Sequence, residues 1–359
     1  MLLFGGRSAE HDVSRVSAAS VARALDPDRY EIVPVAITPD GRWLLANAAR
    51  ELLERSRAAL PPALPVEGEP VALPAGPARA EVVPAEGGRP LAVDVVVPLL
   101  HGPYGEDGTV QGLLELAGLP YVGSGVLGSA VGMDKIMMKR AFTAAGIPTA
   151  RFLALRDGHD RRGFCDDVEA ELGYPCFVKP SNMGSSVGVS KAHDRAELER
   201  AVGTALRYDE WILAEEAVPG REIEVAVLGD DPPEASSPGE IVPGAEFYDY
   251  ADKYEDGAAQ LLAPAPLTDE AATEVRGLAV RAFEACRCEA MARVDFFYDE
   301  HGRGFVCNEL NTIPGFTPVS MYPRLWEVSG LPYGALLDRL IELALARHAR
   351  RAARAGARR

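Results

Sequence analysis

Two short runs of the chain, 291–298 and 305–311, alternate between hydrophobic and polar residues. Alternation with a period of two predicts β-strands, because successive side chains of a strand point to opposite faces. Gly302 lies between the two runs, so we expect the strands to form a hairpin. One face of the first strand is then apolar and consists of Ala292, Val294 and Phe296.

The other face of this hairpin is polar and carries the candidate chemistry. A turn near Gly302 sets Asp295 opposite Glu309 and Arg293 opposite Asn311. Two carboxylates and an amide oxygen are hard ligands of the kind that Mg²⁺ prefers, and substrate phosphates usually complete its shell. A solvated strand face with a cross-strand salt bridge is the alternative interpretation.

The residues directly after the hairpin favour the metal interpretation. The segment 312–317 contains Gly315 and follows the polar strand without a gap. Backbone N–H groups of such a loop can bind an anion. The sequence therefore predicts a site for phosphate chemistry at this end of the hairpin.

The first third of the chain predicts strands and helices of an α/β domain. Strands are expected at 1–4, 30–37 and 93–100, and the last is mostly apolar, as in a central parallel strand. His101 follows that strand directly, and ligands of open α/β sheets bind beyond the carboxyl ends of strands. Residues 46–90 are rich in Ala, Pro and Glu without a persistent period, which predicts an irregular insertion.

The middle of the chain carries two lysines and a loop of small residues. Lys135 lies on a predicted helix, 129–145, and Lys179 on a short strand. The following segment, 181–189, is rich in Ser and Gly, which let the backbone wrap closely around phosphates. It matches neither the P-loop nor the dinucleotide-binding pattern, so a flexible linker is the alternative to a phosphate cover.

The last third predicts further strands and helices around the hairpin. A strand at 211–216 ends in two acids, and amphipathic helices are expected at 269–286 and 333–346. The aromatic and charged stretch 246–254 has no clean period, which suggests an ordered loop near the site. The basic tail 347–359 is expected to be a frayed helix or a disordered end without function.

Composition narrows the class of protein. A chain of 359 residues with 47% hydrophobic and 25% charged residues predicts a soluble protein of two or three domains. The net charge of −16 argues against nucleic acid as a partner, because phosphate backbones require a basic surface. No apolar run or leader pattern suggests a membrane segment. Five cysteines without zinc spacing fit a reduced cytoplasm.

Seven motifs occur in an order and spacing that resemble one known family. They are 4–14, 101–109, 133–135, Lys179 with 184–188, 247–254, 292–295 and 308–312. Together they resemble the D-alanine–D-alanine ligases, ATP-grasp enzymes of peptidoglycan precursor synthesis. The resemblance covers almost the whole chain except 46–90, 230–240 and the tail.

The resemblance implies an α/β, three-domain ATP-grasp fold. A parallel-sheet N-terminal domain that binds substrate spans 1–123, a central ATP-grasp domain spans 124–214, and a C-terminal ATP-grasp and metal-binding domain spans 215–346. ATP lies between the last two domains, and the protein is a cytoplasmic homodimer. Its ligands are two D-alanine molecules, ATP and two Mg²⁺ ions, which Mn²⁺ can replace.

The resemblance also implies roles for individual residues at the nucleotide. Lysines hold the phosphates, two serines cover them, and a run of acids lines the adenine and the ribose. These residues are Lys135, Lys179, Ser185, Ser186, Glu215, Glu216, Val218, Glu222 and Lys253. The metal ligands are Asp295, Glu309 and Asn311.

For the amino-acid substrates, the resemblance implies a second set of residues. Substrate is bound by Glu10, His101, Arg293, Gly315, Ser320 and Met321, and catalysis depends on Glu10, Ser185, Tyr254, Arg293 and Gly315. Glu10 receives the ammonium of the first D-alanine with help from His101. A hydrogen-bonded link of Glu10, Ser185 and Tyr254 ties the domains closed.

Two departures from the family and three alternatives remain. The first strand is short, and Glu216 stands where a lysine often occurs in the adenine pocket. A ligase that joins D-alanine to D-lactate or D-serine is the main alternative, and the pair Lys253-Tyr254 argues against it. The other two alternatives are an ATP-grasp ligase for other amino acids and an ATP-binding regulator without catalytic activity. Intact Arg293 and Asp295 argue against the regulator.

Overall fold

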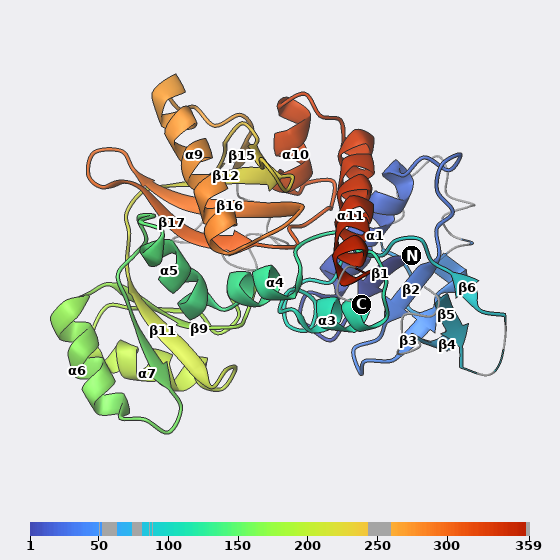
Figure 1. The fold of residues 1–359 in the computed structure, drawn as a ribbon. Coiled ribbons are helices and arrows are strands. Elements are labelled where there is room, and N and C mark those ends of the chain that lie inside the picture. Colours follow the sequence, from blue (N-terminus) through green and yellow to red (C-terminus); the bar gives the residue numbers. More distant parts are fainter. Residues whose placement is uncertain are drawn as a thin grey trace.

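Three β-sheets follow one another along the chain (Figure 1). A computed structural model describes residues 1–49, 51, 63–73, 81–85, 87, 89–242 and 260–356. The predicted loop 246–254, which contains Lys253 and Tyr254, lies outside the described residues. The arrangement confirms the predicted α/β class, with helices packed on sheets throughout.

The first sheet is mixed rather than purely parallel. Its strands, in sheet order, are β6 (Leu91–Ala92), β5 (Glu81–Pro84), β4 (Glu69–Ala72), β3 (Trp43–Leu45), β2 (Pro34–Ile37), β1 (Leu2–Gly5) and β7 (Val97–Pro98). Strands β2, β1 and β7 are parallel, as predicted, but β3 to β6 are antiparallel. The prediction of an irregular 46–90 segment is therefore wrong for β4 and β5, which are too short to show a period.

Strand β1 lies in the middle of two hydrophobic layers. Leu2 and Phe4 point into one buried cluster, whereas Leu3 points into another. A strand that is covered on both faces must be apolar at every position, which explains its composition. Helix α1 (His11–Ala24) covers the first face, and α3 (Thr109–Leu116) follows the loop after β7.

The second sheet is antiparallel and carries one of the candidate lysines. Its strands, in sheet order, are β10 (Ser190–Ala192), β9 (Cys176–Pro180), β11 (Trp211–Glu216) and β8 (Phe152–Arg156). Helices α6 (Arg161–Glu171) and α7 (Arg195–Ala205) pack on it. The predicted strand 211–216 is confirmed, and Lys179 lies on β9.

The third sheet contains the predicted hairpin. Its strands are β15 (Gln260–Leu262), β14 (Gly239–Val242), β12 (Arg221–Leu228), β16 (Met291–Asp299) and β17 (Gly304–Asn311), and β13 (Glu234–Ala235) pairs with β12. Helix α9 (Asp269–Ala285) covers one face, as its amphipathic period predicts. The apolar side chains Ala292, Val294 and Phe296 are all buried beneath it.

The predicted helix 129–145 is two helices. Helix α4 (Val126–Met133) ends and α5 (Lys135–Ala144) begins at Asp134, whose backbone is extended. The Asp134 carboxylate accepts a hydrogen bond from the N–H of Met137 at 2.9 Å, a regular N-terminal cap. The break places Lys135 at the first position of a helix instead of in its middle.

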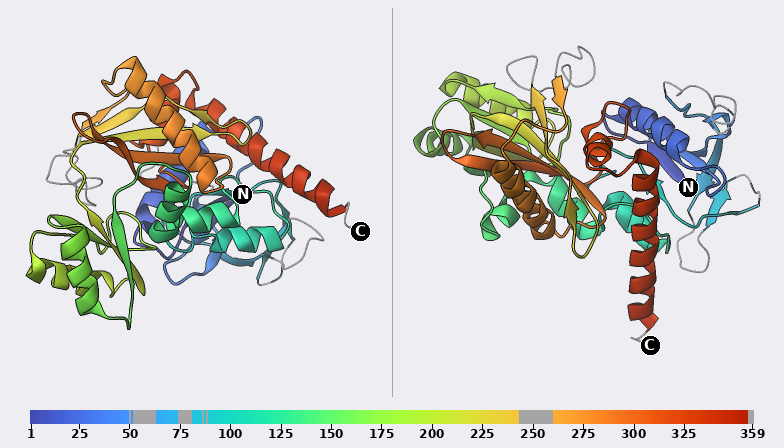
Figure 2. Two further views of the ribbon diagram at one scale, coloured as in Figure 1. Left: turned by 60° about the vertical axis from the view of Figure 1, so that its left-hand side comes forward. Right: turned by 90° about the horizontal axis from the view of Figure 1, so that it is seen from above.

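The C-terminal helices join the first sheet to the third. Helices α10 (Met321–Val328) and α11 (Tyr333–Gly356) share a buried cluster with β1, α1 and the start of β16. The later part of α11 extends beyond the sheets (Figure 2). The prediction that the chain frays after residue 346 is therefore wrong for residues 347–356, which continue α11.

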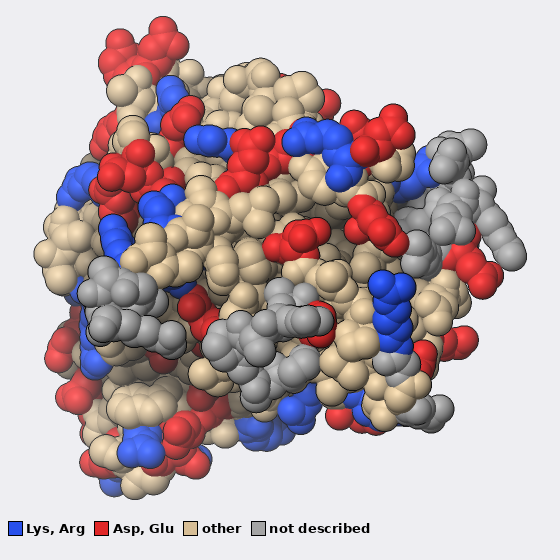
Figure 3. Space-filling view, turned by 45° about the vertical axis from the view of Figure 1, so that its right-hand side comes forward, with Lys and Arg blue, Asp and Glu red and all other residues tan. Residues whose placement is uncertain are grey.

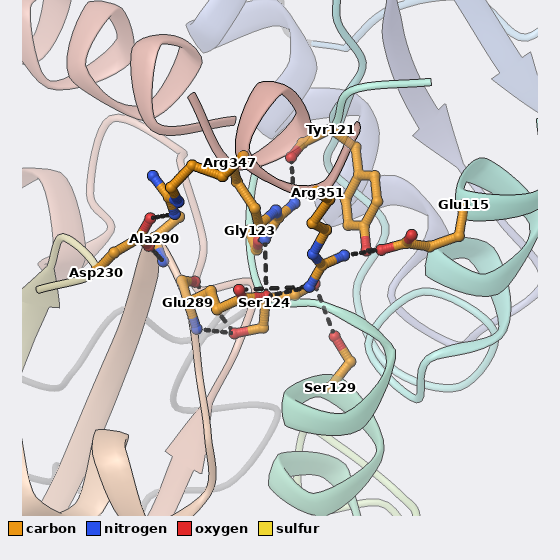
Figure 4. Close-up of polar contacts among 11 residues, drawn as sticks. Glu115, Tyr121, Gly123, Ser124, Ser129, Asp230, Glu289, Ala290, Arg347 and Arg351 are labelled. Atoms are coloured by element: carbon orange, nitrogen blue, oxygen red, sulfur yellow. Dashed lines mark hydrogen bonds and ion pairs between the residues drawn. The ribbon is translucent and has the colours of Figure 1, made fainter. Parts of the chain in front are cut away.

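Arg347 explains why the helix continues. Its side chain is only 4% exposed, and its guanidinium donates to the carbonyl oxygens of Gly123 and Tyr121, the latter at 2.6 Å (Figure 4). It also forms an ion pair with Glu289 at 3.3 Å and lies 4.4 Å from the centre of the Tyr121 ring. One arginine of the tail therefore joins α11 to the segment between α3 and α4 and to the start of β16.

Two neighbouring arginines extend this contact. Arg350 pairs with Asp230 at 2.6 Å. Arg351 pairs with Glu289 at 3.0 Å and with Glu115 (Figure 4). These ion pairs are more exposed than that of Arg347, so they contribute less to the stability of the fold, because solvent screens them. The basic composition of the tail is thus matched by acids from three parts of the fold.

We expect Arg347→Met to lower the free energy of unfolding by about 3 kcal/mol. The change removes two hydrogen bonds from a charged donor, each of which contributes roughly 1.5–3 kcal/mol. Urea unfolding followed by circular dichroism measures the difference. Arg354→Met on the exposed part of α11 is the matched control and should change stability by less than about 0.5 kcal/mol. Equal effects of both changes would contradict this role of Arg347.

Candidate active site

The hairpin has the register that the sequence predicts. Asp295 pairs with Glu309 and Arg293 with Asn311 across β16 and β17, and a bulge follows Asp295. The Arg293 guanidinium donates to both carboxylate oxygens of Asp295, at 2.7 and 2.6 Å. Asn311 donates its amide N–H to the same carboxylate at 2.9 Å. The polar face is therefore one connected group of side chains.

Arg293 is also held from the neighbouring strand. Glu224 on β12 lies 3.1 Å from its Nε atom, on the side away from Asn311. Burial disfavours the charge of this guanidinium, but the carboxylates of Asp295 and Glu224 outweigh burial and hold its pKa well above the usual range. Arg293 is thus a permanently charged donor in a fixed position.

The two candidate phosphate lysines approach the hairpin from the second sheet and from α5. Lys135 donates to the carbonyl of Met183 at 2.6 Å and lies 3.9 Å from the Glu309 carboxylate. Lys179 donates to Glu215 at 3.2 Å and reaches Asn308 at 3.5 Å. Lys135 therefore lies near the predicted metal ligand Glu309, and Lys179 near Asn308, the residue before it.

The loop between β9 and β10 reaches the first domain. Ser185 and Ser186 have φ angles of 48° and 58°, a left-handed conformation that costs roughly 1 kcal/mol for a residue with a side chain. Such strain is typical of functional loops. The Ser185 hydroxyl donates to the Glu10 carboxylate at 2.5 Å, so this predicted contact is present. Tyr254, the third member of the predicted link, lies outside the described residues.

Close packing around Glu10 leaves little space on this side. A Cβ atom at Gly184 would lie 3.0 Å from a Glu10 carboxylate oxygen, and one at Gly102 would lie 3.1 Å from it. Glycine is therefore required at Gly102, where φ is also 72°. The Glu10 carboxylate is enclosed by loops of two different sheets.

His101 is buried beneath these loops. Its Nδ1 atom is 3.0 Å from the carbonyl oxygen of Ile313, and its Nε2 atom is 3.3 Å from the Ser17 hydroxyl. Burial lowers the pKa of His101, although the charge of Glu10 opposes this shift. Both ring nitrogens thus have partners in the protein, and His101 lies under the site rather than facing it with a spare nitrogen.

Glu106 is a buried acid that the sequence reasoning passed over. Its carboxylate accepts hydrogen bonds from the N–H of Gly102 at 2.9 Å and of Ile313 at 3.3 Å. Burial, and then the charge of Glu10, raise its pKa to about 8. In the sequence, Glu106 could have been identified as a candidate from its place in the glycine-rich loop after β7, but only His101 of that loop was predicted to have a role. Glu106 joins the first sheet to the loop after β17.

The loop after β17 brings Gly315 and Ser320 together. A Cβ atom at Gly315 would lie 2.6 Å from the Ser320 hydroxyl, which accepts the N–H of Thr317 at 3.0 Å. Any side chain at Gly315 would therefore displace Ser320. Unlike Gly315 and Ser320, Met321 is buried in the core, where its side chain packs against Gly239. Only its backbone is therefore available to a substrate.

The predicted adenine pocket contains one acid with a spare oxygen. Glu215 is buried; its Oε2 atom contacts Lys139 at 3.4 Å and Lys179 at 3.2 Å, and Oε1 has no hydrogen-bond partner among the described residues. Burial alone would raise the pKa of Glu215, but the two lysines outweigh burial and lower it. A buried acceptor of this kind fits an amino group such as that of adenine.

Glu216, the departure from the family pattern, is engaged in ion pairs. Its carboxylate accepts from the N–H and the guanidinium of Arg151 at 2.9 and 2.8 Å, and from Arg303 at 2.5 Å. Val218 lies in the connection between β11 and β12, and Glu222 lies on β12. Both residues are half-buried. The acid at this position is thus balanced by two arginines.

The described residues hold no group of three or more His, Cys, Asp and Glu side chains that is arranged for a metal ion. The predicted ligands are two carboxylates and an amide, a set that leaves most of a Mg²⁺ shell to water and phosphate oxygens.

No helix in the described part of the chain is long and apolar enough to cross a membrane. Acidic and basic side chains are interspersed on the face shown in Figure 3.

Comparison with known proteins gives matches along nearly the whole chain. A family model described as "D-ala D-ala ligase N-terminus" matches residues 1–124, and one described as "D-ala D-ala ligase C-terminus" matches residues 141–342. A D-alanine–D-alanine ligase of Geobacillus kaustophilus is 48% identical over 350 residues, which cover 97% of this chain and 94% of the relative.

Two solved structures share the fold. The D-alanine–D-alanine ligase of Coxiella burnetii superposes with a TM-score of 0.85 at 36% identity, covering 100% of this chain and 98% of that one. The VanG D-Ala:D-Ser ligase of Enterococcus faecalis superposes with a TM-score of 0.84 at 34% identity, covering 96% and 98%. The fold therefore also occurs in a ligase with a different second substrate.

The pKa of Glu106 gives a prediction about stability. Its folded pKa of about 8 exceeds the ordinary value of 4.5, so between these values only the native state retains the proton. The free energy of unfolding should therefore decrease as the pH rises from 6.5 to 8, by up to about 1.4 kcal/mol per pH unit from this group. Urea unfolding of the unmodified protein and of Glu106→Gln across this range measures the contribution.

The comparison of slopes isolates Glu106, because every other titrating group is shared by the two proteins. The Gln variant should lack this decrease, whatever its stability at a single pH. Identical slopes would mean that Glu106 is ionised in the native state.

Proposed function

This chain belongs to the D-alanine–D-alanine ligase family, and we propose how its residues join two D-alanine molecules, with ATP, into a precursor of peptidoglycan. The observation that carries the proposal is the hydrogen bond between Glu10 and Ser185, which come from loops of two different sheets, beside the buried His101, on which the charges of both Glu10 and Arg293 act. A carboxylate that can hold an ammonium thus stands near a fixed guanidinium and two lysines. An ATP-dependent ligase of amino acids needs these groups together.

The first step activates a carboxylate. A carboxylate is a poor electrophile, so the first D-alanine is phosphorylated by ATP to an acyl phosphate, and ADP is released. Phosphoryl transfer needs positioning and charge neutralisation more than covalent help from the protein. Lys135 and Lys179 hold the transferred phosphates, and Ser185 and Ser186 lie over them. The unbonded Oε1 of Glu215 supports the placement of adenine between the second and third sheets.

Glu10 binds the ammonium of the first D-alanine. Its carboxylate already accepts the Ser185 hydroxyl, so substrate and phosphate loop are recognised by one group. Tyr254 completes this link, and His101 supports Glu10 from below. Closure of the loop keeps water from the acyl phosphate, which would otherwise hydrolyse.

The second D-alanine attacks the carbonyl carbon of the acyl phosphate as a free amine. Collapse of the tetrahedral intermediate forms the C–N bond, breaks the C–O bond and releases inorganic phosphate, which carries away the amine proton. Arg293, the N–H of Gly315 and Ser320 bind this substrate and the oxyanion of the tetrahedral intermediate, with the backbone of Met321 beside them. Loss of one such donor typically costs about 10²–10³ in rate. The ion pairs that fix Arg293 support this role, because a preorganised donor needs no rearrangement during the reaction.

Asp295, Glu309 and Asn311 would hold two Mg²⁺ ions, or Mn²⁺. The hard oxygens of the three side chains fit such ions, which would neutralise the phosphate charge when bound. Asp295 is now engaged by Arg293 and Asn311, so binding requires some exchange of these hydrogen bonds.

We extend the proposal to the organisation of the protein. We place the domains at 1–123, 124–214 and 215–346, close to the limits of the three sheets, and residues 347–356 continue the last helix. A cytoplasmic homodimer fits the family. Lys253 and Glu222 contribute to the nucleotide site, together with Glu216 and Val218.

The main alternative is a D-alanine–D-serine or D-alanine–D-lactate ligase. The likeness to the Enterococcus enzyme keeps the serine alternative open, but the higher identity to a D-alanine–D-alanine ligase favours the dipeptide. A silent regulator is disfavoured by the intact hairpin group, because a protein that only binds ATP does not need Arg293.

Product analysis tests the choice of substrate. We expect D-alanyl-D-alanine to predominate at neutral pH when D-alanine, D-serine and D-lactate are present together with ATP and Mg²⁺. L-alanine in place of D-alanine should give no ADP release above background. Chromatography with mass detection identifies the products, and a majority of depsipeptide or of the serine product would exclude the dipeptide assignment.

Glu309→Gln should nearly abolish turnover while the fold is retained. The change keeps the size of the side chain but removes a negative charge from the metal-binding face. ADP release across a Mg²⁺ titration measures the effect, and thermal unfolding checks the fold. Glu284→Gln on the exposed face of α9 is the matched control. Near-normal turnover of Glu309→Gln at saturating Mg²⁺ would contradict the metal assignment.

A further inference from the structure

A third lysine, which is fully buried, lies behind the nucleotide site. Lys139 is on α5, one turn after Lys135, and its side chain is only 1% exposed. Its ammonium group lies 3.2 Å from the Thr149 hydroxyl, 3.3 Å from the carbonyl oxygen of Asn308 and 3.4 Å from Oε2 of Glu215. All three of its hydrogens therefore have acceptors inside the protein.

Lys139 shares its carboxylate partner with a phosphate-binding lysine. Lys179 contacts the same Oε2 atom of Glu215 at 3.2 Å, from the more exposed side. Two ammonium groups thus flank one carboxylate, and the group carries one net positive charge. The excess charge is expected on the side of Lys179, because Lys139 is enclosed and cannot turn away from Glu215.

The balance of charges decides what Lys179 can do. A buried carboxylate needs a counter-ion, and breaking such a pair is costly. If Lys179 were the only counter-ion of Glu215, binding a phosphate would compete with that pair. With Lys139 in place, Glu215 stays neutralised when Lys179 moves toward a phosphate. Repulsion between the two ammonium groups also favours that movement.

We propose that Lys139 is a positioning residue of the nucleotide site: it neutralises Glu215 and so leaves the ammonium of Lys179 available to the phosphates of ATP. The inference rests on the proposed function only in naming ATP as the ligand. Lys139 itself does not touch the nucleotide. A merely structural lysine, which joins α5 to β17, would affect stability without a selective effect on phosphate binding.

Inorganic triphosphate separates the phosphate contacts from the adenine contacts of Glu215. Isothermal titration calorimetry of the full-length protein with triphosphate and Mg²⁺ compares Lys139→Met, Glu215→Gln and the double variant. We expect Lys139→Met to weaken binding at least about tenfold, because Glu215 then captures Lys179. The double variant removes the capturing carboxylate and should recover binding to within about threefold of the unmodified protein.

Matched controls distinguish positioning from general effects of charge and packing. Arg140→Met removes one positive charge from the exposed side of the same helix and should leave triphosphate binding unchanged. Lys139→Gln retains a donor for Thr149 and Asn308, and should weaken binding as Lys139→Met does. It replaces the Met variant if that variant fails to fold. In turnover, the KM for ATP should rise while the KM for D-alanine stays unchanged.

Three results would overturn the inference. They are unchanged triphosphate binding in Lys139→Met and Lys139→Gln, a double variant that binds as weakly as the single one, and no triphosphate binding by the unmodified protein. Recovery in the double variant supports the inference even if the unmodified protein forms no D-alanyl-D-alanine. In that case, the proposed function fails while the role of Lys139 at a phosphate site stands.

Discussion

A guanidinium held between carboxylates is the interaction on which the active site depends. Arg293 is fixed by Asp295 on its own strand and by Glu224 on the next, and Asn311 completes the group from the partner strand of the hairpin. The apolar face of the same strands is buried under α9, so the polar side chains cannot rotate away. The loops that carry Glu10, Ser185 and Gly315 surround this fixed centre.

The site is assembled from three sheets: the first and third share a buried cluster with α10 and α11, and polar contacts between loops and strands tie the parts together at the site. Ser185 reaches Glu10, Glu106 binds the N–H of Ile313, and Lys135 approaches Glu309. The first two contacts join loops of different sheets, and the third joins the start of α5 to strand β17 of the third sheet. Loops joined in this way can separate and close again, which suits an enzyme that admits two amino acids and a nucleotide.

Local patterns predicted what is local in this protein. The hairpin and its register follow from a period of two around a glycine turn, and α9 follows from its amphipathic period. The break at Asp134 was missed because the apolar period runs through it and a single capping residue marks it. Arg347 and Lys139 gave no usable signal, since their burial depends on partners distant in sequence, such as Tyr121 and Glu215. Glu106 was marked only by its place in the glycine-rich loop after β7, and its contact with Ile313 could not be predicted. The roles of Lys253 and Tyr254 came from family resemblance alone.

The shared cluster beneath β1 has a consequence for how the chain folds as it is made. Leu2 and Phe4 of the first strand are buried together with Leu336 and Leu340 of the last helix. A ribosome releases these segments far apart in time, so this face of the first sheet is covered only in part, by α1, until α11 has been made. Contacts of such long sequence separation close slowly, and the exposed apolar face is a site for aggregation in the meantime. The nascent chain therefore depends on protection of its N-terminal sheet until α11 arrives.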